Sequence, residues 1–443
     1  MFAGVASSSG TIMASHLGLA SPDQVLEDIL AGHQDYLHKF IELYSAVMEH
    51  EDALCAEERN YVALMAACRH KCSVLLSEQR ARFTDSGGPP QWLEGLDHAP
   101  ERIRSLHIAN IVLAHRPWMF HRSHIEELVK AGLSFAELVH GLTILIYFHS
   151  MSSMLHALGI EAATGQADLD YHVPSQLGAG GSEGSPRSSE LSTGGVAVLL
   201  QRMKGLTTNS NNSAAVPDHP YQHQSPLPPV TAPHNTVRNS NSDAAYATGL
   251  PGPVFDAVEL DEASEDEKYM RFSLYSPNIS FTYKDFYRRG GKSEAPTLKY
   301  QHQWEEIGFS MLAKFTSQDL ADSIDIKFKT AFNMTYNTCG DRKNVSTTPF
   351  RRAIWYYTQS LYGIRRDDYD YSTINEVLDR PLKVFLKTMS VAPERLVTAH
   401  DSAPSIIDDL RTSEQVHIVI LAAEARMQAE MVYAMLAVER YYM

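Results

Sequence analysis

Residues 416–442, VHIVILAAEARMQAEMVYAMLAVERYY, decide the fold of this 443-residue chain. The stretch is apolar on nearly every face of a helix, and the polar residues that interrupt it are Glu424, Arg426, Gln428 and Glu430. A helix with this profile is usually buried at the centre of its domain, because no face is polar enough to lie against water. Thr412 and Gln415 have the spacing of a capping box, so we expect the helix to begin there.

Helical patterns cover most of the remaining chain. Leu26–Ala46 carries apolar residues at helical spacing, and Ser134 followed by Glu137 forms a capping box for a helix that runs to about Leu158. Helical patterns return from Tyr300 onward. Almost no stretch alternates apolar and polar residues with the period of two that a half-buried strand shows. The sequence therefore predicts an all-α fold.

Composition divides the chain into segments. Residues 161–267 are rich in Gly, Ser, Asn and Pro, as in GAGGSEGSPRSSE, and contain too few apolar groups to offset the entropy of ordering. We expect this segment to be a mostly disordered linker with one short docking helix near 195–206, and we expect residues 1–22 to be disordered. Two helical domains remain, at 23–160 and 268–443, and each is long enough to bury a core.

Charge and apolar runs exclude several classes of protein. A net charge of −15 argues against a general binder of nucleic acid or of anionic membranes. The longest apolar run, Leu142–Phe148, is far shorter than a membrane span, so we expect no membrane insertion. The stretch before Asp23 has no Lys or Arg and so lacks the charged region of a secretory signal, and four cysteines are too few for a disulfide framework. We expect a reducing compartment, the cytoplasm, with a nuclear pool left open.

One cysteine-containing run has the chemistry of a reactive thiol. The run MAACRHKCS, residues 65–73, places Cys68 and Cys72 four residues apart, which is one face of a continuous helix. Arg69 and His70 lie beside them, and neighbouring cations lower the pKa of a thiol. The CxxxC spacing differs from the redox-typical CxxC, and free cysteines are common core residues. A peroxide-reducing enzyme and a buried structural pair both stay open.

The histidine pattern does not indicate a metal site. His140, His149 and His156 share one predicted helix, but their spacing does not bring them into a compact set of ligands. The sequence also contains no phosphate-binding glycine loop, no HExxH motif and no zinc-type Cys/His spacing. We expect neither a metal nor a cofactor.

Three clusters in the C-terminal part have complementary chemistry. The first, Thr335–Thr338, is rich in hydroxyl and amide groups, and the second, Thr347–Arg351, combines a helix start with a guanidinium that can address an anion. The third, Arg411–His417, begins the long apolar helix and contains Glu414. A cation and a separate carboxylate are the two poles that hold a zwitterionic amino acid, although two ordinary helix starts would give the same pattern.

These clusters, together with several longer runs, resemble the sestrin family. The matching runs are MAACRHKCS, PQWLEGLDHAP, VLAHRPW, KDFYRRG, TYNT, FRRAIWYY, GIRRDDYDY, LKVFLKT and EARMQAEMVYA. The resemblance implies two similar all-α halves, each like the alkylhydroperoxidase AhpD. It also implies two activities, leucine-regulated inhibition of TOR complex one during amino-acid starvation and defence against oxidants.

The resemblance further implies an amino-acid site. Arg351 would meet the carboxylate of the ligand, Glu414 would meet its ammonium, and a lid of threonines would close over it. Phe350 and Ile407 stand where the vertebrate members that bind leucine have leucine and tryptophan, so leucine, methionine and isoleucine stay open as ligands. The implied set is Thr335, Tyr336, Asn337, Thr338, Thr347, Phe350, Arg351, Ile407, Arg411, Glu414 and His417.

A partner and an enzyme activity are also implied. The motif that docks the GATOR subcomplex, the activator of TOR signalling, corresponds to Asp367, Asp368, Tyr369, Asp370 and Tyr371. The family's peroxidase set is a cysteine, a tyrosine two residues later and a histidine seven residues later. Cys72 matches, but the other two positions hold Val74 and Gln79. We therefore expect a regulator that binds an amino acid, with an alkyl hydroperoxide reductase at Cys72 as the alternative.

Overall fold

The computed structural model describes residues 26–27, 29–49, 53–160, 195–210, 272–285, 304–398, 407 and 409–443. Over these residues nearly every element is a helix, and the only strands are two residues long each, which confirms the predicted all-α class. The predictions of disorder at 1–22 and over most of 161–267 lie outside the described residues. The docking helix predicted near 195–206 is present and somewhat longer, as α10 (Gly195–Ser210).

The N-terminal half contains α3 (Gln34–Met48), α4 (Ala56–Arg69), α5 (Ser73–Asp85), α6 (Glu101–Arg104), α7 (Leu106–His115), α8 (Arg122–Lys130) and α9 (Phe135–Ala157). Short 3-10 turns lie before and between them, at η1 (Ala31–His33), η2 (Pro90–Glu94), η3 (Leu96–His98) and η4 (Pro117–Met119). The C-terminal half begins with the π-helical turn η8 (Trp304–Gly308) and continues with α12 (Phe309–Phe315), α13 (Gln318–Asn333), α14 (Thr348–Leu361), α15 (Ser372–Val377), α16 (Arg380–Val391), α17 (Glu394–Thr398) and α18 (Thr412–Tyr442). Between α13 and α14, β1 (Thr338–Cys339) and β2 (Arg342–Lys343) form an antiparallel hairpin.

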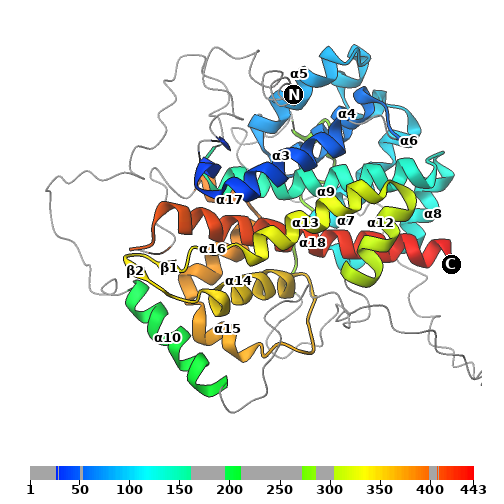
Figure 1. The fold of residues 1–443 in the computed structure, drawn as a ribbon. Coiled ribbons are helices and arrows are strands. Elements are labelled where there is room, and N and C mark those ends of the chain that lie inside the picture. The colour runs from blue at the N-terminus through cyan, green and yellow to red at the C-terminus, as the bar shows by residue number, and fades with distance from the viewer. Residues whose placement is uncertain are drawn as a thin grey trace, which may run out of the picture. The chain divides into compact units, whose positions relative to one another are not determined.

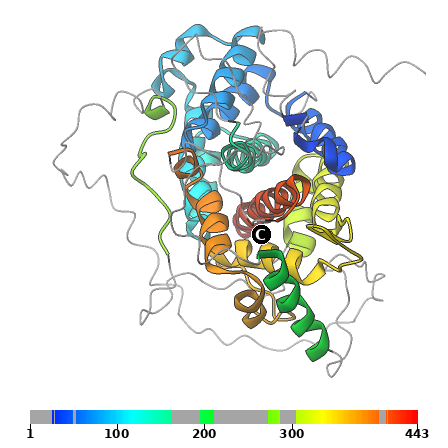
Figure 2. The same cartoon turned by 90° about the vertical axis from the view of Figure 1, so that its left-hand side faces the viewer.

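The core is centred on α9 and α18, which pack against each other and lie side by side in both views (Figures 1 and 2). Every residue from Val416 to Val438 on α18 is buried, as is every residue from Leu138 to His156 on α9. The prediction of a buried central helix at the C-terminal end is confirmed. Since α9 and α18 come from different halves of the chain, both halves share this core, and their described residues belong to one compact unit. The division into two AhpD-like domains stays a prediction.

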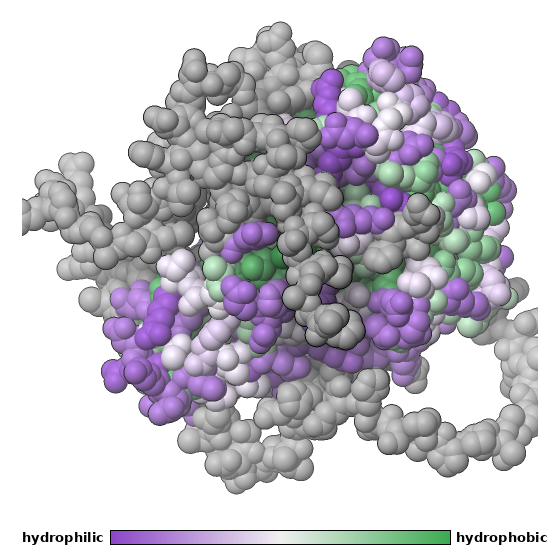
Figure 3. All heavy atoms as spheres, turned by 45° about the horizontal axis from the view of Figure 1, so that its top comes forward, coloured by the Kyte–Doolittle hydropathy of each residue, from purple (hydrophilic) through white to green (hydrophobic). Residues whose placement is uncertain are grey.

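The start of α9 follows its sequence signal. The hydroxyl of Ser134 accepts the N–H of Glu137 at 3.2 Å, and the carboxylate of Glu137 accepts the N–H of Ser134 at 2.8 Å. By length and apolarity α9 is the one helix in the described residues that could cross a membrane. Its most apolar stretch is fully buried inside the protein. Figure 3 shows hydrophilic residues interspersed with small apolar areas on one face of the molecule.

The start of α18 corrects the predicted capping box. The helix begins at Thr412, so Arg411 is the cap residue and Glu414 stands three positions after it. Glu414 reaches back and accepts the N–H of Arg411 at 3.0 Å, whereas the Gln415 amide donates to the carbonyl of Leu410 at 3.1 Å. The pairing of Thr412 with Gln415 was therefore wrong by one residue, because the carboxylate of Glu414 is the better acceptor for an exposed N–H.

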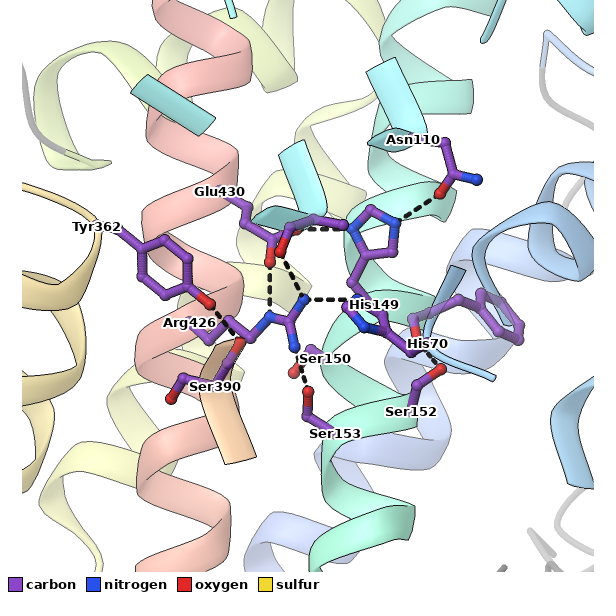
Figure 4. Close-up of polar contacts among 12 residues, drawn as sticks. His70, Asn110, His149, Ser150, Ser152, Ser153, Tyr362, Ser390, Arg426 and Glu430 are labelled. Atoms are coloured by element: carbon purple, nitrogen blue, oxygen red, sulfur yellow. Dashed lines mark hydrogen bonds and ion pairs between the residues drawn. The ribbon is translucent and has the colours of Figure 1, made fainter. Parts of the chain in front are cut away.

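A buried polar network joins α18 to the N-terminal half (Figure 4). Arg426 donates to Glu430 at 2.7 Å, and its Nη2 lies 2.7 Å from Nε2 of His70, which follows α4. His149 of α9 is hydrogen-bonded to Glu430 at 2.8 Å and to Asn110 of α7 at 2.8 Å. A buried ion pair is tolerated when hydrogen bonds satisfy its remaining donors and acceptors, and these contacts supply them.

The other polar residues of α18 are paired as well. Glu424 lies 2.6 Å from the Nζ of Lys327 on α13, and the same carboxylate oxygen accepts the hydroxyl of Tyr36 on α3 at 2.6 Å. The amide of Gln359 on α14 donates to Gln428 at 2.6 Å. The polar residues that interrupt the apolar helix are therefore the points at which distant helices are joined.

The chain reverses between the two central cysteines. Helix α4 ends at Arg69, and Lys71 has a left-handed φ of 53°. The N–H of Cys72 donates to the carbonyl of Ala67 at 3.0 Å, and the N–H of Lys71 donates to that of Cys68 at 3.1 Å, which is the pattern of a Schellman motif. The expectation that both cysteines share one helical face is wrong, because the helix ends between them.

The segment 272–285, which the sequence assigns to the C-terminal domain, packs on the N-terminal half. The carbonyl of Leu274 accepts the N–H of Leu96 at 2.8 Å, and the carbonyl of Asn278 accepts from Arg69 at 2.9 Å. The hydroxyl of Tyr283 donates to the carbonyl of Leu361 on α14 at 2.9 Å. This segment therefore contacts both halves.

Candidate functional site

A small cavity lies between the β1–β2 hairpin, the first turn of α14 and the first turns of α18. Its volume is about 30 Å³, which is room for about two water molecules. Seven residues of the predicted set line it, namely Tyr336, Thr338, Thr347, Phe350, Arg351, Glu414 and His417. The structure adds Cys339, Leu410, Ile418 and Leu421.

The carboxylate of Glu414 is the negative pole of the cavity. One oxygen accepts the hydroxyl of Thr338 at 2.7 Å, and the other accepts the N–H of Gly340 at 2.9 Å and that of Arg411 at 3.0 Å. An ionised carboxylate has about four acceptor sites, so these donors leave capacity for a further one. Arg411 contributes its backbone to the site, since its N–H orients Glu414.

The guanidinium of Arg351 is the positive pole. It is buried on the first turn of α14 and donates to the carbonyl of Phe332, to the hydroxyl of Thr348 at 3.1 Å and to that of Thr347 at 3.3 Å. These acceptors are neutral groups, and arginine keeps its proton at any physiological pH. Its charge lies at a helix N-terminus, which also favours an anion.

The other titratable groups of the lining are neutral. Burial lowers the pKa of His417 to about 3, although a bond to the carbonyl of Ala331 opposes the shift. Burial also raises the pKa of the Cys339 thiol to about 11 and that of the Tyr336 hydroxyl to about 12. The lining therefore presents one positive and one negative group. These two charges are complementary to the carboxylate and the ammonium of a free amino acid.

Hydroxyl contacts join the segment before β1 to the start of α14. The hydroxyls of Thr335 and Thr347 lie 3.3 Å apart, and Asn337 has a left-handed φ of 52° while its carbonyl accepts the N–H of Val345 at 3.0 Å. Thr335 and Asn337 lie beside the cavity and are not part of its lining. They shape the segment that covers it.

The N-terminal half contacts the segment that covers the cavity, and the sequence did not predict this contact. Nδ1 of His33 in η1 is hydrogen-bonded to the hydroxyl of Tyr336, and that hydroxyl donates to the carbonyl of Gly32 at 3.2 Å. The ring of His33 also lies 6.0 Å from that of His417. No local signal identifies His33, because its partner is about 300 residues away in the chain.

The apolar wall differs from the predicted one. Phe350 lines the cavity as expected, but Ile407 does not, and Leu410 takes a place in the lining instead. Ile418 and Leu421 complete the wall from the next turns of α18. They could have been found from the sequence, because Ile418 lies four residues after Glu414 and Leu421 lies four residues after His417 on the same helix.

The predicted thiol site is closed. Cys68 and Cys72 are both fully buried, and so is Gln79. The amide of Gln79 has no hydrogen-bond partner among the described residues, and an amide is neither an acid nor a base at physiological pH. Val74 is apolar, so the two positions that would assist Cys72 contribute no proton relay.

The three histidines of α9 have separate partners and do not converge. His140 is hydrogen-bonded to the carbonyl of Val47 at 2.9 Å, and His156 to that of His70 at 2.8 Å. His149 belongs to the network around Glu430. Within the described part of the chain no group of three His, Cys, Asp or Glu residues is arranged to hold a metal ion.

The acidic turn before α15 exposes its carboxylates and half-buries its rings. Asp367, Asp368 and Asp370 are exposed, whereas Tyr369 and Tyr371 form an edge-to-face pair with ring centroids 5.1 Å apart. Asp368 accepts from Arg366 at 3.0 Å, and the hydroxyl of Tyr371 accepts the N–H of Arg366 at 2.9 Å. The turn is thus a fixed acidic surface.

Comparison with known proteins gives a consistent result. A family model described as "PA26 p53-induced protein (sestrin)" matches residues 6–442. The chain is 33% identical to Sestrin-3 of Mus musculus over 94% of this chain and 85% of the relative. It is 32% identical to the Sestrin homolog of Drosophila melanogaster, covering 95% and 92%, and 33% identical to Sestrin-2 of Homo sapiens, covering 97% and 87%.

Proposed function

This chain belongs to the sestrin family of stress-responsive regulators, and from that premise we propose that it binds a free amino acid with an apolar side chain, leucine first. The observation that supports this most directly is the meeting of Arg351 and Glu414 on one small cavity whose other titratable groups are neutral. The ligand's carboxylate would bind at Arg351, and its ammonium would take the acceptor position on Glu414 that Thr338, Gly340 and Arg411 leave open.

The cavity must enlarge to admit the ligand. A volume of about 30 Å³ holds about two waters, which is far less than a branched aliphatic side chain needs. The segment 335–337 covers the cavity, and its contacts would have to break for the cavity to open. Tyr336 of this segment is 39% exposed and is hydrogen-bonded to His33 and Gly32 of η1. Opening of the cover would let Phe350 and Leu410 separate, and ligand binding would close it again.

Without a bound amino acid, the protein would dock on the GATOR subcomplex and so inhibit TOR complex one. The acidic turn Asp367–Tyr371 supplies exposed charge beside half-buried tyrosine rings, a combination that suits an interface anchor. The amino acid would release the partner only by binding the free protein more tightly than the docked one, because equal affinity for both would shift nothing.

Isothermal titration of an amino-acid panel tests the proposal. We expect leucine to bind with an affinity between millimolar and micromolar, about −4 to −8 kcal/mol. Arg351→Ala and Glu414→Ala should each abolish measurable binding, since each leaves the opposite charge of the ligand without its partner. Arg380→Ala and Glu42→Ala, at exposed positions away from the cavity, are the matched controls. No binding by any amino acid, or equal loss in the controls, would overturn the proposal.

A further inference from the structure

Helix α10, which lies within the segment predicted to be a linker, packs on the C-terminal half. It contacts α14 and α15 and lies beside α15 in both views (Figures 1 and 2). Val196, Leu199 and Met203 are buried on one stripe of the helix, while Val198 on another face is 42% exposed. The spacing of the buried residues is that of an amphipathic helix docked on a surface.

The N-terminal end of α10 reaches the β1–β2 hairpin. A Cβ placed on Gly340 would lie 3.3 Å from Cγ2 of Val196 and 2.5 Å from the carbonyl oxygen of Asp409. The turn at Gly340 is therefore enclosed, with α10 on one side and the chain that leads into α18 on the other. Only glycine fits this close approach at a left-handed φ of 58°.

The enclosed turn holds the negative pole of the cavity. The N–H of Gly340 donates to Glu414 at 2.9 Å, next to the bond from Thr338 at 2.7 Å. If α10 left its place, Val196 would no longer restrain Gly340, and the hairpin could move away from Glu414. Such a movement would reach the cavity through the backbone hydrogen bond from Gly340 to Glu414.

The same helix touches the element that carries the acidic turn. Helix α15 begins at Ser372, directly after Tyr371, and Asp370 accepts both the N–H of Ser372 at 2.9 Å and its hydroxyl at 2.7 Å. Since α10 packs on α15, one helix contacts both the hairpin beside the cavity and the helix that follows the acidic turn.

We propose that α10 is a positioning and control element of the amino-acid site, which holds the Gly340 turn against Glu414 when docked and weakens the site when displaced. Linkage then requires that a bound amino acid strengthen the docking of α10 by the same factor. The part concerning affinity rests on the proposed function, and the part concerning the Gly340 turn does not.

Hydrogen exchange at the Gly340 amide in the full-length chain tests the contact without any ligand. Val196→Asp/Leu199→Asp places charges in the buried stripe and should displace α10, whereas Val198→Asp, on the exposed face of the same helix, is the matched control. Val196→Ala removes the Cγ2 that approaches Gly340 and adds no charge to the buried stripe, so we expect the helix to stay docked. We expect exchange to be about tenfold faster or more in the double variant, to be moderately faster in Val196→Ala and to be unchanged in the control. Unchanged exchange in both Val196 variants would overturn the proposal.

Titration of leucine into the same variants tests the effect on the site. We expect the double variant to weaken binding by about tenfold, and Val198→Asp to bind as the parent chain does. Faster exchange at Gly340 with unchanged affinity would overturn the control of the site by α10. If the parent chain binds no amino acid, the proposed function fails, and the exchange result alone then decides whether α10 holds the Gly340 turn.

Discussion

The backbone of Gly340 adopts a left-handed φ of 58° in a turn that leaves no space for a side chain. Its N–H is bonded to Glu414, so a left-handed conformation, close packing and a hydrogen bond to the cavity lining coincide at one residue. A substitution at this residue therefore disturbs the backbone conformation, the packing and the bond to Glu414 together, and the cost of the close packing is isolated by comparison with a glycine that has open space around it.

We expect Gly340→Ala to lower the free energy of unfolding by about 1–3 kcal/mol, because the new Cβ would meet the carbonyl of Asp409 at 2.5 Å in a strained conformation. Gly132→Ala is the matched control, since Gly132 also has a positive φ, 101°, but nothing lies within 4 Å of its Cβ position. Urea denaturation of both variants measures the difference. Equal losses would mean that the close approach costs nothing beyond the backbone strain.

Cys72 is a chemically reactive residue type whose surroundings do not support a reaction. We expect Cys72→Ser to leave the consumption of an alkyl hydroperoxide unchanged, because the thiol is buried and its neighbours Val74 and Gln79 relay no proton. Multiple-turnover assays with a thiol reductant measure this, with Cys55→Ser, at an exposed cysteine, as the control. Turnover that is lost in Cys72→Ser and retained in Cys55→Ser would establish the alternative enzyme.

At the scale of elements, α18 is the helix to which the others attach. Its apolar residues bury it, but its polar residues select its neighbours, since Arg426 and Glu430 meet α9 and the turn after α4 while Glu424 meets α13. Without these polar groups, α18 could be rotated about its axis and still bury as much apolar surface as it does in the observed orientation. The buried pairs therefore contribute to a single arrangement as well as to stability.

Removing one partner of the Arg426–Glu430 ion pair should lower the free energy of unfolding. Arg426→Met and Glu430→Leu should each lower the free energy of unfolding by about 3–5 kcal/mol, because each leaves a buried charge without its partner. The double variant should lose clearly less than the sum, and a double-mutant cycle from denaturation curves gives this coupling energy. Glu126 and Lys130 form a pair of the same spacing on the surface of α8 and serve as the control with little coupling. Strict additivity at Arg426 and Glu430 would contradict the expectation.

At the scale of the whole molecule, the two halves are joined by uncharged histidines in a charged setting. Burial lowers the pKa of His70, His115 and His149, and nearby arginines lower it further. The charged groups that act on these histidines are Arg69, Arg116, Arg426 and Glu430, and Glu394 acts in turn on Arg69 and Arg426. Protonation would place additional positive charge where cations are already present.

Stability should therefore fall on mild acidification. A histidine whose pKa is lower in the folded than in the unfolded chain takes up its proton at a higher pH when the chain is unfolded. Its contribution to the free energy of unfolding is therefore present above pH 6.5 and is lost as the pH falls below that value. Each such histidine can contribute a loss of at most about 1 kcal/mol between pH 6.5 and 5.5, so the three together set an upper limit of about 3 kcal/mol. Urea midpoints across this range measure it. His115→Gln should reduce the slope, whereas His98→Gln, at an exposed position, should not. A flat profile would show that the cluster is already protonated or hydrated.

The sequence determined the local features of this protein. The apolar run at 416–442 predicted a buried helix, and the pairing of Ser134 with Glu137 located the start of α9, because helical spacing and caps depend on residues within one turn. The chemistry of the candidate site could also be predicted, since a guanidinium and a carboxylate are visible at two helix starts. Family resemblance then assigned them to one ligand.

Only the tertiary structure decided which distant groups meet. It selected Leu410 for the lining in place of Ile407, brought His33 to Tyr336 and α10 to Gly340, and gave each polar residue of α18 its partner on another helix. Periodicity reports that a face is buried but carries no information about what covers it, because burial free energy is nearly independent of the identity of the neighbour. Pairings across hundreds of residues depend on shape and on hydrogen-bond geometry that exist only once the helices have packed.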